Sequence, residues 1–158
     1  MIEKYGSMYV LKAKQRLPMS KAEAWDFLSD PKNLKVITPD YMGFDILEGA
    51  DKRMHQGQII QYIVKPVMNI KTKWVTEITH CVPQEFFVDE QRFGPYALWH
   101  HKHFLHEDGK ETIMEDVIHY KLPFSPISNW FHNLIVKPRL EGIFSYREQK
   151  LTALFGAA

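Results

Sequence analysis

Two histidines separated by one residue are the feature of this sequence best suited to chemistry. His101 and His103 lie in the stretch Ala97–His106, which we predict to be a β-strand. Side chains two residues apart on a strand point to the same side, so both imidazoles share one face. Asp116, on the next predicted strand, would face them. An imidazole beside a carboxylate can transfer protons near neutral pH, because the unperturbed pKa of histidine is about 6.5. His101, His103 and Asp116 are therefore candidate catalytic residues.

The same two histidines could instead bind a metal ion, with Asp89, Glu90 or Asp116 as further ligands. A metal site needs three or four ligands, and neither a nearby cysteine nor a His-x-x-x-His helix accompanies this pair. We therefore expect a hydrogen-bonded polar network in place of a metal, and no cofactor. The sequence also has no nucleophile elbow, P-loop or dinucleotide fingerprint.

Three consecutive antiparallel strands are predicted to position these groups. Turn signals at Gly94-Pro95 and at Asp108-Gly109 separate the apolar runs. The three strands are Phe86–Arg92, Ala97–His106 and Thr112–Leu122. The face that carries the histidines also carries large apolar side chains, a mixture typical of ligand pockets. A purely structural core rarely contains so many polar groups, because each of them needs a partner.

We expect the pocket to be formed by several strands together with the C-terminal helix. The predicted ligand-binding residues are Trp74, Asp89, Gln91, Trp99, His101, His103, Met114, Asp116, Tyr120 and Trp130. The aromatic rings would form broad apolar walls with polar handles, although core packing accounts for each ring equally well. Within this set, Gln91, His101, His103 and Asp116 are expected to lie close together and to hydrogen-bond one another or bound water.

The remaining segments predict a sheet and a covering helix. Further strands are expected at Met8–Leu17, Phe44–Leu47, Gly57–Lys65 and Ile70–Cys81. Ser20–Glu23 fits a capping box that begins the first of two short helices after the first strand. After Pro123 the apolar period changes from 2 to 3.6 residues, which predicts a long helix starting near Pro126, with a kink or break at Pro138. This order predicts an α+β fold in which a curved antiparallel sheet of about seven strands wraps around the C-terminal helix.

Composition limits the classes of protein to consider. The 158 residues suit a single domain over 1–158, and 45% hydrophobic with 25% charged residues is usual for a globular protein. A net charge of +1 gives no reason to expect binding to nucleic acid. No apolar run approaches the roughly 20 residues of a transmembrane helix, and the N-terminus lacks the apolar core of a signal peptide. With a single cysteine, Cys81, these features favour a cytoplasmic protein without stable membrane insertion.

The order of elements resembles the helix-grip fold of the START-like, polyketide cyclase/dehydrase and lipid-transport (SRPBCC) superfamily. The segment Ser20–Asn33, followed by Thr38-Pro39, is similar to the opening of small bacterial members. The central stretch resembles a ligand-binding subgroup at Phe87, Asp89, Gln91, Gly94, Pro95, Trp99, His101, His103, Thr112, Met114, Asp116, Ile118, Tyr120 and Pro123. Two positions depart from that pattern: Ile118 stands where valine is typical, and Lys110-Glu111 where a glycine is common.

This resemblance implies that a small hydrophobic, amphipathic or lipid-like ligand binds between the sheet and the C-terminal helix. The superfamily also contains cyclases and dehydratases that use polar pocket groups, and partner-binding members whose pocket is small or collapsed. Three interpretations therefore stay open. We favour ligand binding; the alternatives are a cyclase, dehydratase or hydrolase that uses His101, His103 and Asp116, and a partner-binding module.

Overall fold

Short connections between successive strands produce one antiparallel sheet. The computed structural model describes residues 1–66, 69–123 and 128–158. Within these residues eight strands lie side by side in the order β1-β2-β8-β7-β6-β5-β4-β3. Their bounds are β1 Ile2–Tyr5, β2 Met8–Leu17, β3 Asp45–Glu48, β4 Ile59–Val64, β5 Thr72–Val82, β6 Phe86–Phe93, β7 Leu98–Asp108 and β8 Glu111–Lys121. The α+β class and the meander of the sequence-based prediction are confirmed.

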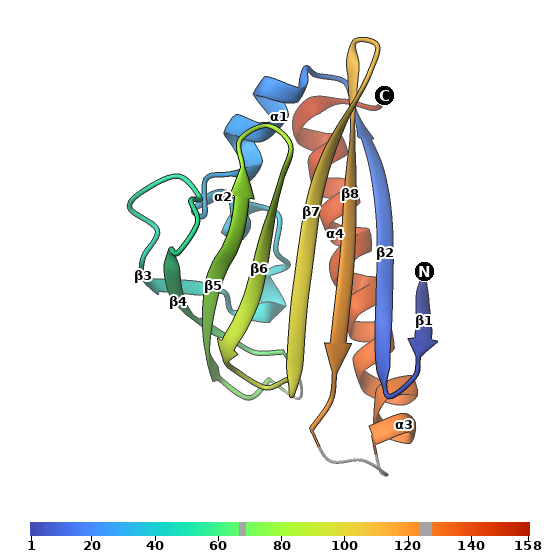
Figure 1. Cartoon of the computed structure of the whole chain (residues 1–158). Helices are drawn as coiled ribbons and strands as arrows, with labels where there is room; N and C mark the ends of the chain where they lie inside the picture. Colours follow the sequence, from blue (N-terminus) through green and yellow to red (C-terminus); the bar gives the residue numbers. More distant parts are fainter. Residues whose placement is uncertain (67–68, 124–127) are drawn as a thin grey trace.

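One long helix lies along the concave face of this sheet (Figure 1). It is built from α3 (Ser128–Phe131), a π-helical turn η2 (His132–Val136) and α4 (Lys137–Phe155). The predicted start near Pro126 lies outside the described residues. Pro138 is in the first turn of α4, directly after the π-helical turn, and it has no N–H to donate to Leu134. The helix continues through Pro138 without a break, and the nearest irregularity is the change from π-helical to α-helical hydrogen bonding just before Lys137.

The sheet has one strand more than the sequence predicted. β1 pairs with β2 through a tight turn in which Gly6 has a φ of +59°, a conformation that favours glycine. The strand is four residues long, and only Ile2 is partly buried. So short an edge strand leaves no alternating apolar pattern, which is why the sequence did not indicate it.

Two short helices follow β2, as predicted, and α1 contacts β7 and β8. The capping box at the start of α1 (Lys21–Leu28) is confirmed. The Glu23 N–H donates to Ser20 Oγ at 3.3 Å, and the Ser20 N–H donates to Glu23 Oε2 at 2.9 Å. The second helix, α2, spans only Asn33–Val36, and a 3-10 turn, η1 (Asp40–Met42), follows it.

Strand register decides which side chains face α4. His103 stands directly opposite Phe87 on β6 and Asp116 on β8, and His101 stands opposite Ile118. Ile118 and Asp116 are fully buried beneath the helix. Because side chains alternate between the two faces, this register confirms the inner face that the sequence analysis assigned to the three central strands.

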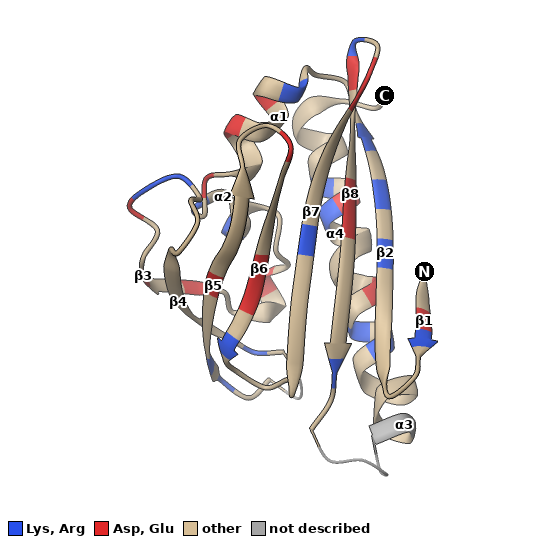
Figure 2. Cartoon of the chain, viewed as in Figure 1, with Lys and Arg blue, Asp and Glu red and all other residues tan. Residues whose placement is uncertain are grey.

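The outer face of the sheet near β2 is a solvated, charge-paired surface. Figure 2 shows the basic residues of β2 beside acidic residues of β8. Lys14 lies 3.2 Å from Glu115, and Arg16 lies 2.6 Å from Asp108 and 3.1 Å from Glu111. Exposed pairs of this kind contribute at most about 1 kcal/mol each, so this face gives solubility more than stability.

Packing of α4 on the sheet can be tested with two leucines of the same helix. Leu151 is fully buried, whereas Leu154 is 46% exposed. Leu151→Ala should lower the free energy of unfolding by about 2–5 kcal/mol, through lost burial and the cavity left behind. Leu154→Ala should change it by less than about 1 kcal/mol. Urea denaturation measures both, and equal losses would contradict this packing of the helix.

Candidate functional site

Two histidines and two aspartates from neighbouring strands form a closed group, here called the His–Asp cluster (Asp89, His101, His103 and Asp116). His101 Nε2 lies 2.8 Å from Asp116 Oδ1, and His103 Nε2 lies 2.6 Å from Asp89 Oδ2. His103 Nδ1 is 3.0 Å from Asp116 Oδ1, and His101 Nδ1 is 3.5 Å from Asp89 Oδ2. The two imidazole rings are in contact, with centroids 3.6 Å apart and planes tilted by 34°. Each imidazole therefore turns one nitrogen toward Asp116 and the other toward Asp89, and His103 is within hydrogen-bonding distance of both.

Arg147 of α4 joins this cluster from the opposite layer. Its Nη1 donates to Asp116 Oδ1 at 3.1 Å, and its Nη2 contacts Met114 Sδ at 3.2 Å. The Arg147 side chain is 9% exposed and that of Asp116 is 1% exposed, so this ion pair is shielded from water. The pair connects the covering helix to the centre of the sheet.

The environment sets the ionisation of the cluster. Burial opposes the charge on Asp116, but Arg147 and the hydrogen bonds from both histidines outweigh it, so the pKa of Asp116 lies well below its ordinary value. Burial likewise opposes the charge on Asp89, yet the two histidines lower its pKa. Burial and the neighbouring His103 lower the pKa of His101. Burial also disfavours charge on His103, but its hydrogen bonds to both aspartates more than compensate and raise its pKa.

These pKa shifts indicate which groups of the cluster are charged. Both nitrogens of His103 lie within hydrogen-bonding distance of an ionised carboxylate, so an imidazolium satisfies both contacts. His101 has only one nitrogen at that distance and is satisfied as the neutral ring. With Arg147 and His103 positive and with Asp89 and Asp116 negative, the buried group has no net charge. Neutrality lowers the free-energy cost of burying these charges, but Asp116 Oδ2 and Arg147 Nε are buried without a hydrogen-bond partner among the described residues.

A cavity of about 140 Å³ lies beside the cluster, between the sheet, α4 and the segment around α2 and η1. Its walls are mainly aromatic and aliphatic, and they include Tyr62, Trp74, Tyr96, Trp99, Leu140 and Phe144. Asp89, His101, Arg139 and Arg147 supply polar atoms to the same lining. Mostly apolar walls with a few convergent polar groups are typical of a small-molecule site.

Eight of the ten predicted ligand-binding residues divide into three groups. Trp74, Asp89, Trp99 and His101 line this cavity. His103 lines a smaller adjoining space of about 60 Å³, which Asp89 and Arg147 also line. Met114, Asp116 and Tyr120 are buried on the expected face but do not line the cavity.

Gln91 has a different role from the one predicted. Its Oε1 accepts from the Tyr96 N–H at 3.1 Å, and its Nε2 donates to the Tyr96 carbonyl at 2.7 Å. These bonds replace the β6–β7 ladder, whose pairing ends at Glu90 and His100. A Cβ at position 94 would lie 2.4 Å from Gln91 Oε1, which explains the glycine there. The expectation that Gln91 joins the His–Asp cluster is therefore wrong, because the amide holds a loop.

Trp130 does not reach the pocket either, since its side chain is 66% exposed. The inward positions of the helix are His132, Val136 and Leu140, all of which are buried. Trp130 lies two residues before His132, and a two-residue step turns a helix by about 200°. The aromatic residue thus faces outward, whereas a histidine occupies the inward position.

Arg147, His132 and the cavity-lining Arg139 are polar residues that the sequence-based prediction missed. Arg147 lies on the inward stripe with Leu140, Phe144 and Leu151, at spacings of three or four residues. A single cation within such a stripe is a signal that could have identified the buried ion pair. His132 Nε2 accepts from the Tyr120 hydroxyl at 2.7 Å, its Nδ1–H donates to Asn133 Oδ1 at 3.1 Å, and its ring stacks on Tyr9 at 3.5 Å.

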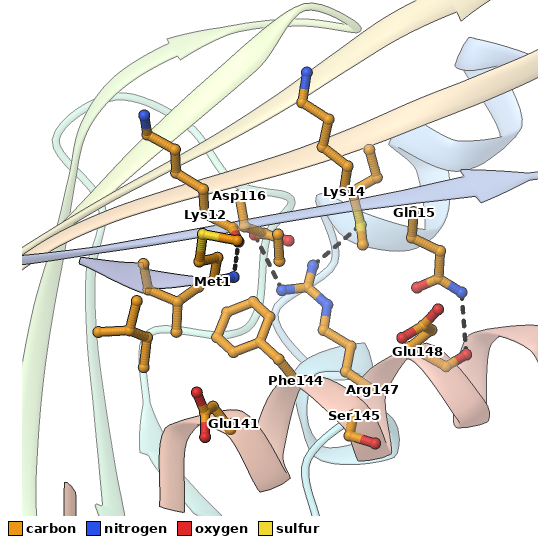
Figure 3. A pocket seen from close by; sticks show the side chains of 14 residues that line it. Met1, Lys12, Lys14, Gln15, Asp116, Glu141, Phe144, Ser145, Arg147 and Glu148 are labelled. Carbon is orange, nitrogen blue, oxygen red and sulfur yellow. Dashed lines mark hydrogen bonds and ion pairs between the residues drawn. The ribbon is translucent and has the colours of Figure 1, made fainter. Parts of the chain in front are cut away.

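A wider groove of about 370 Å³ lies on the other side of Arg147, between β2 and α4 (Figure 3). Its lining includes Lys12, Lys14, Gln15, Glu141, Ser145 and Glu148. Figure 3 shows Arg147 reaching from α4 to Asp116, with Phe144 beside it. Arg147 and Phe144 line both the groove and the cavity, so these two side chains form the wall that the two spaces share.

Comparisons with known proteins bear on the fold. No family model matches the sequence, and no curated protein matches it. An aromatase/cyclase from Streptomyces sp. R1128 has a similar structure, with a TM-score of 0.64 and 16% sequence identity over 94% of this chain and 92% of that chain. A START superfamily protein from Mycobacterium smegmatis has a TM-score of 0.63 and 10% identity over 92% of this chain and 98% of its own. Major latex-like protein 151 from Panax ginseng has a TM-score of 0.65 and 9% identity over 95% and 99%, respectively.

These similarities show a START-like helix-grip fold, as the sequence-based resemblance predicted. At such low identities they carry no information on activity, because one fold hosts many functions. None of the helices in the described part of the chain is both long and apolar enough to span a lipid bilayer.

The buried ion pair predicts a large stability effect for Arg147→Met. This change leaves the Asp116 carboxylate buried without its cation, and the free energy of unfolding at pH 7 should fall by about 3 kcal/mol. Lys150→Met, on the same helix, should change it by less than about 0.5 kcal/mol. Adding Asp116→Asn to the Arg147→Met protein should recover part of the loss, because the unpaired charge is then removed. Equal stability of the two single variants in urea denaturation would contradict this role of Arg147.

The buried histidine of the π-helical turn predicts a specific pH dependence. Burial, and to a smaller extent Lys137, lowers the pKa of His132 below its ordinary value of 6.5. The unfolded chain therefore takes up this proton more readily than the folded protein does. The stabilisation is complete above about pH 6.5 and is lost as the pH falls below that value. His132→Gln should reduce this slope in unfolding curves measured between pH 7 and pH 5, and an unchanged slope would refute the assignment.

Proposed function

We propose that this chain, which has the START-like helix-grip fold, binds one small aromatic acid in the cavity between the sheet and α4. The observation that carries the proposal is the cavity itself, with aromatic walls and a few charged groups. Three properties of its lining define the ligand: its volume, an unpaired donor and an unneutralised cation.

The volume favours a molecule of about one ring. A dry cavity of about 150 Å³ in another protein is known to bind benzene, whereas drug-sized ligands occupy roughly 300–1,000 Å³. The present cavity, at about 140 Å³, belongs to the first size class. A single aromatic ring therefore fits better than a lipid chain, and Trp74 and Trp99, whose ring centroids are 5.3 Å apart, offer it edge and face contacts.

Trp74 and Arg139 are the lining residues whose unmatched polar groups bear on a ligand; Arg147 Nε also lacks a partner among the described residues, but its Nη1 pairs with Asp116. Trp74 Nε1 is buried and has no hydrogen-bond partner among the described residues. Arg139 stacks over the Tyr41 ring at 4.0 Å and donates to the Lys65 carbonyl at 3.3 Å, but no carboxylate in the described part of the chain pairs with it. An unpaired buried donor costs about 1–3 kcal/mol, which an acceptor on a ligand would recover. A carboxylate on the ring would provide both an acceptor and a negative charge.

The same geometry disfavours the other two interpretations. Acid–base catalysis by His101 or His103 needs a nitrogen that can reach the substrate, yet every ring nitrogen of the pair faces Asp89 or Asp116 within 3.5 Å. A partner-binding module is expected to have a small or collapsed pocket; the cavity here is small, and its unpaired polar groups are what favour a ligand over a filled core. Ligand binding in the cavity leaves the hydrogen bonds of the His–Asp cluster intact, and it needs no second protein.

Binding of benzoate and of toluene to the metal-free protein tests the proposal. Both should bind saturably in calorimetry, with benzoate in the micromolar to millimolar range, roughly −4 to −8 kcal/mol, and they should change tryptophan emission. Arg139→Met should weaken benzoate binding about tenfold and leave toluene binding unchanged, because only benzoate carries a charge. Leu140→Trp should abolish binding of both by filling the cavity.

Lys137→Met is the matched control, since Lys137 is a basic residue of the same helix that does not line the cavity. It should leave both affinities unchanged. Saturable binding that survives Leu140→Trp in a folded protein would place the ligand elsewhere and refute the proposal.

A further inference from the structure

The His–Asp cluster has two unlike sides. On one side Asp116 Oδ1 lies 2.8 Å from His101 Nε2 and 3.0 Å from His103 Nδ1, so it accepts an N–H from each ring. The opposite nitrogens, His101 Nδ1 and His103 Nε2, both face Asp89 Oδ2, at 3.5 and 2.6 Å. Asp116 thus orients both rings so that one nitrogen of each points toward a second carboxylate.

We propose that Asp89, His101 and His103 form a binding site for a divalent transition-metal ion, a site that borders the aromatic-acid cavity through Asp89 and His101 but whose argument does not depend on that proposal. One donor atom from each of these residues lies within 4.8 Å of the other two. Two histidines and one carboxylate, with further positions open, are a donor set suited to Zn²⁺ or Fe²⁺.

The observed distances are close to those of an assembled site. Donor atoms about 2.1 Å from a metal and separated by tetrahedral or octahedral angles lie about 3.0–3.4 Å apart. The two contacts of Asp89 Oδ2, at 2.6 and 3.5 Å, lie on either side of this range. Side-chain shifts of a few tenths of an ångström would make both fit. The metal would take the place of the proton that joins His103 Nε2 to Asp89.

The outer contacts also fit a metal site. Histidine ligands commonly donate their second N–H to a carboxylate, which fixes the ring and strengthens its donor nitrogen. Asp116 serves both histidines in this way, and Arg147, at 3.1 Å, keeps it ionised and in place. Asp116 and Arg147 are accordingly positioning residues, and only Asp89, His101 and His103 contact the ion.

The net charge of the metal-bound site and the two spaces beside it indicate which ligand would fill the open coordination positions. With a divalent ion bound and His103 neutral, the two aspartates, Arg147 and the metal have a net charge of +1. An anionic oxygen donor would neutralise it. Asp89 and His101 line the apolar cavity, and Asp89 and His103 line the smaller adjoining space, so the open positions face these spaces. Hydroxide or a carboxylate is the class of ligand that fits there.

Titration of chelator-treated protein with Zn²⁺ or Co²⁺ alone tests the site. Calorimetry should show one ion per chain, and the visible spectrum of the Co²⁺ form should show nitrogen and oxygen ligation with fewer than six ligands. Asp89→Asn and His101→Ala should each weaken Zn²⁺ binding at least about 100-fold. Asp116→Asn, an outer-contact change, should weaken it about 10- to 100-fold.

His100→Ala is the matched control, because His100 lies on the same strand but on the outer face, 6.3 Å from the ring of His119. It should leave binding unchanged. Loss of binding in His100→Ala with retention in His101→Ala would assign the ion to the outer surface and overturn the proposal. A wild-type protein that shows no stoichiometric binding, or a Co²⁺ spectrum identical to that of the hydrated ion, would also overturn it. Circular dichroism identifies any variant that fails to fold. In that case the visible spectrum of the wild-type protein with Co²⁺ decides.

Discussion

A carboxylate buried in the middle of a sheet requires a compensating charge, and Asp116 imposes this requirement on the whole molecule. It is 1% exposed, and it accepts from His101, His103 and Arg147. Because Arg147 belongs to α4, neutralising this charge fixes the position of the helix against the sheet. Apolar packing alone would allow the helix to slide, whereas the directional bond from a guanidinium specifies one arrangement. Buried polar groups can supply this kind of conformational specificity, and their cost is offset only when each is paired.

The comparisons with solved structures indicate that apolar packing determines the fold, separately from these polar contacts. Solved structures that are 9–16% identical to this chain have TM-scores of 0.63–0.65 with it. The fold therefore depends on apolar patterning and short connections, which many sequences satisfy. Inside that scaffold this chain places the buried polar groups Asp89, His101, His103, Asp116 and Arg147.

Much of the site was predictable because side chains along a β-strand alternate between the two faces of the sheet, with a period of two residues. The sequence correctly placed His101, His103 and Asp116 on one face, and neighbouring strands in an antiparallel meander brought Asp89 beside them. The inward face of the helix was harder to predict, because a π-helical turn interrupts the period of 3.6 residues before α4. Trp130, expected in the pocket, therefore faces outward, and Arg147 was missed because charged residues are usually assigned to solvent. Gln91 was misassigned because parity indicates a face but not a hydrogen-bond partner.

The early end of the β6–β7 ladder has a consequence for how the protein opens. Beyond Glu90 and His100 the two strands no longer pair, and the Gln91 amide joins them through the Tyr96 backbone. Five residue pairs therefore join β6 and β7, whereas eleven pairs join β7 and β8. Asp89 and His101 are paired across the shorter ladder. Because local opening is easiest where few backbone hydrogen bonds must break, we expect solvent to reach these two residues by opening of β6 from β7 before β7 separates from β8.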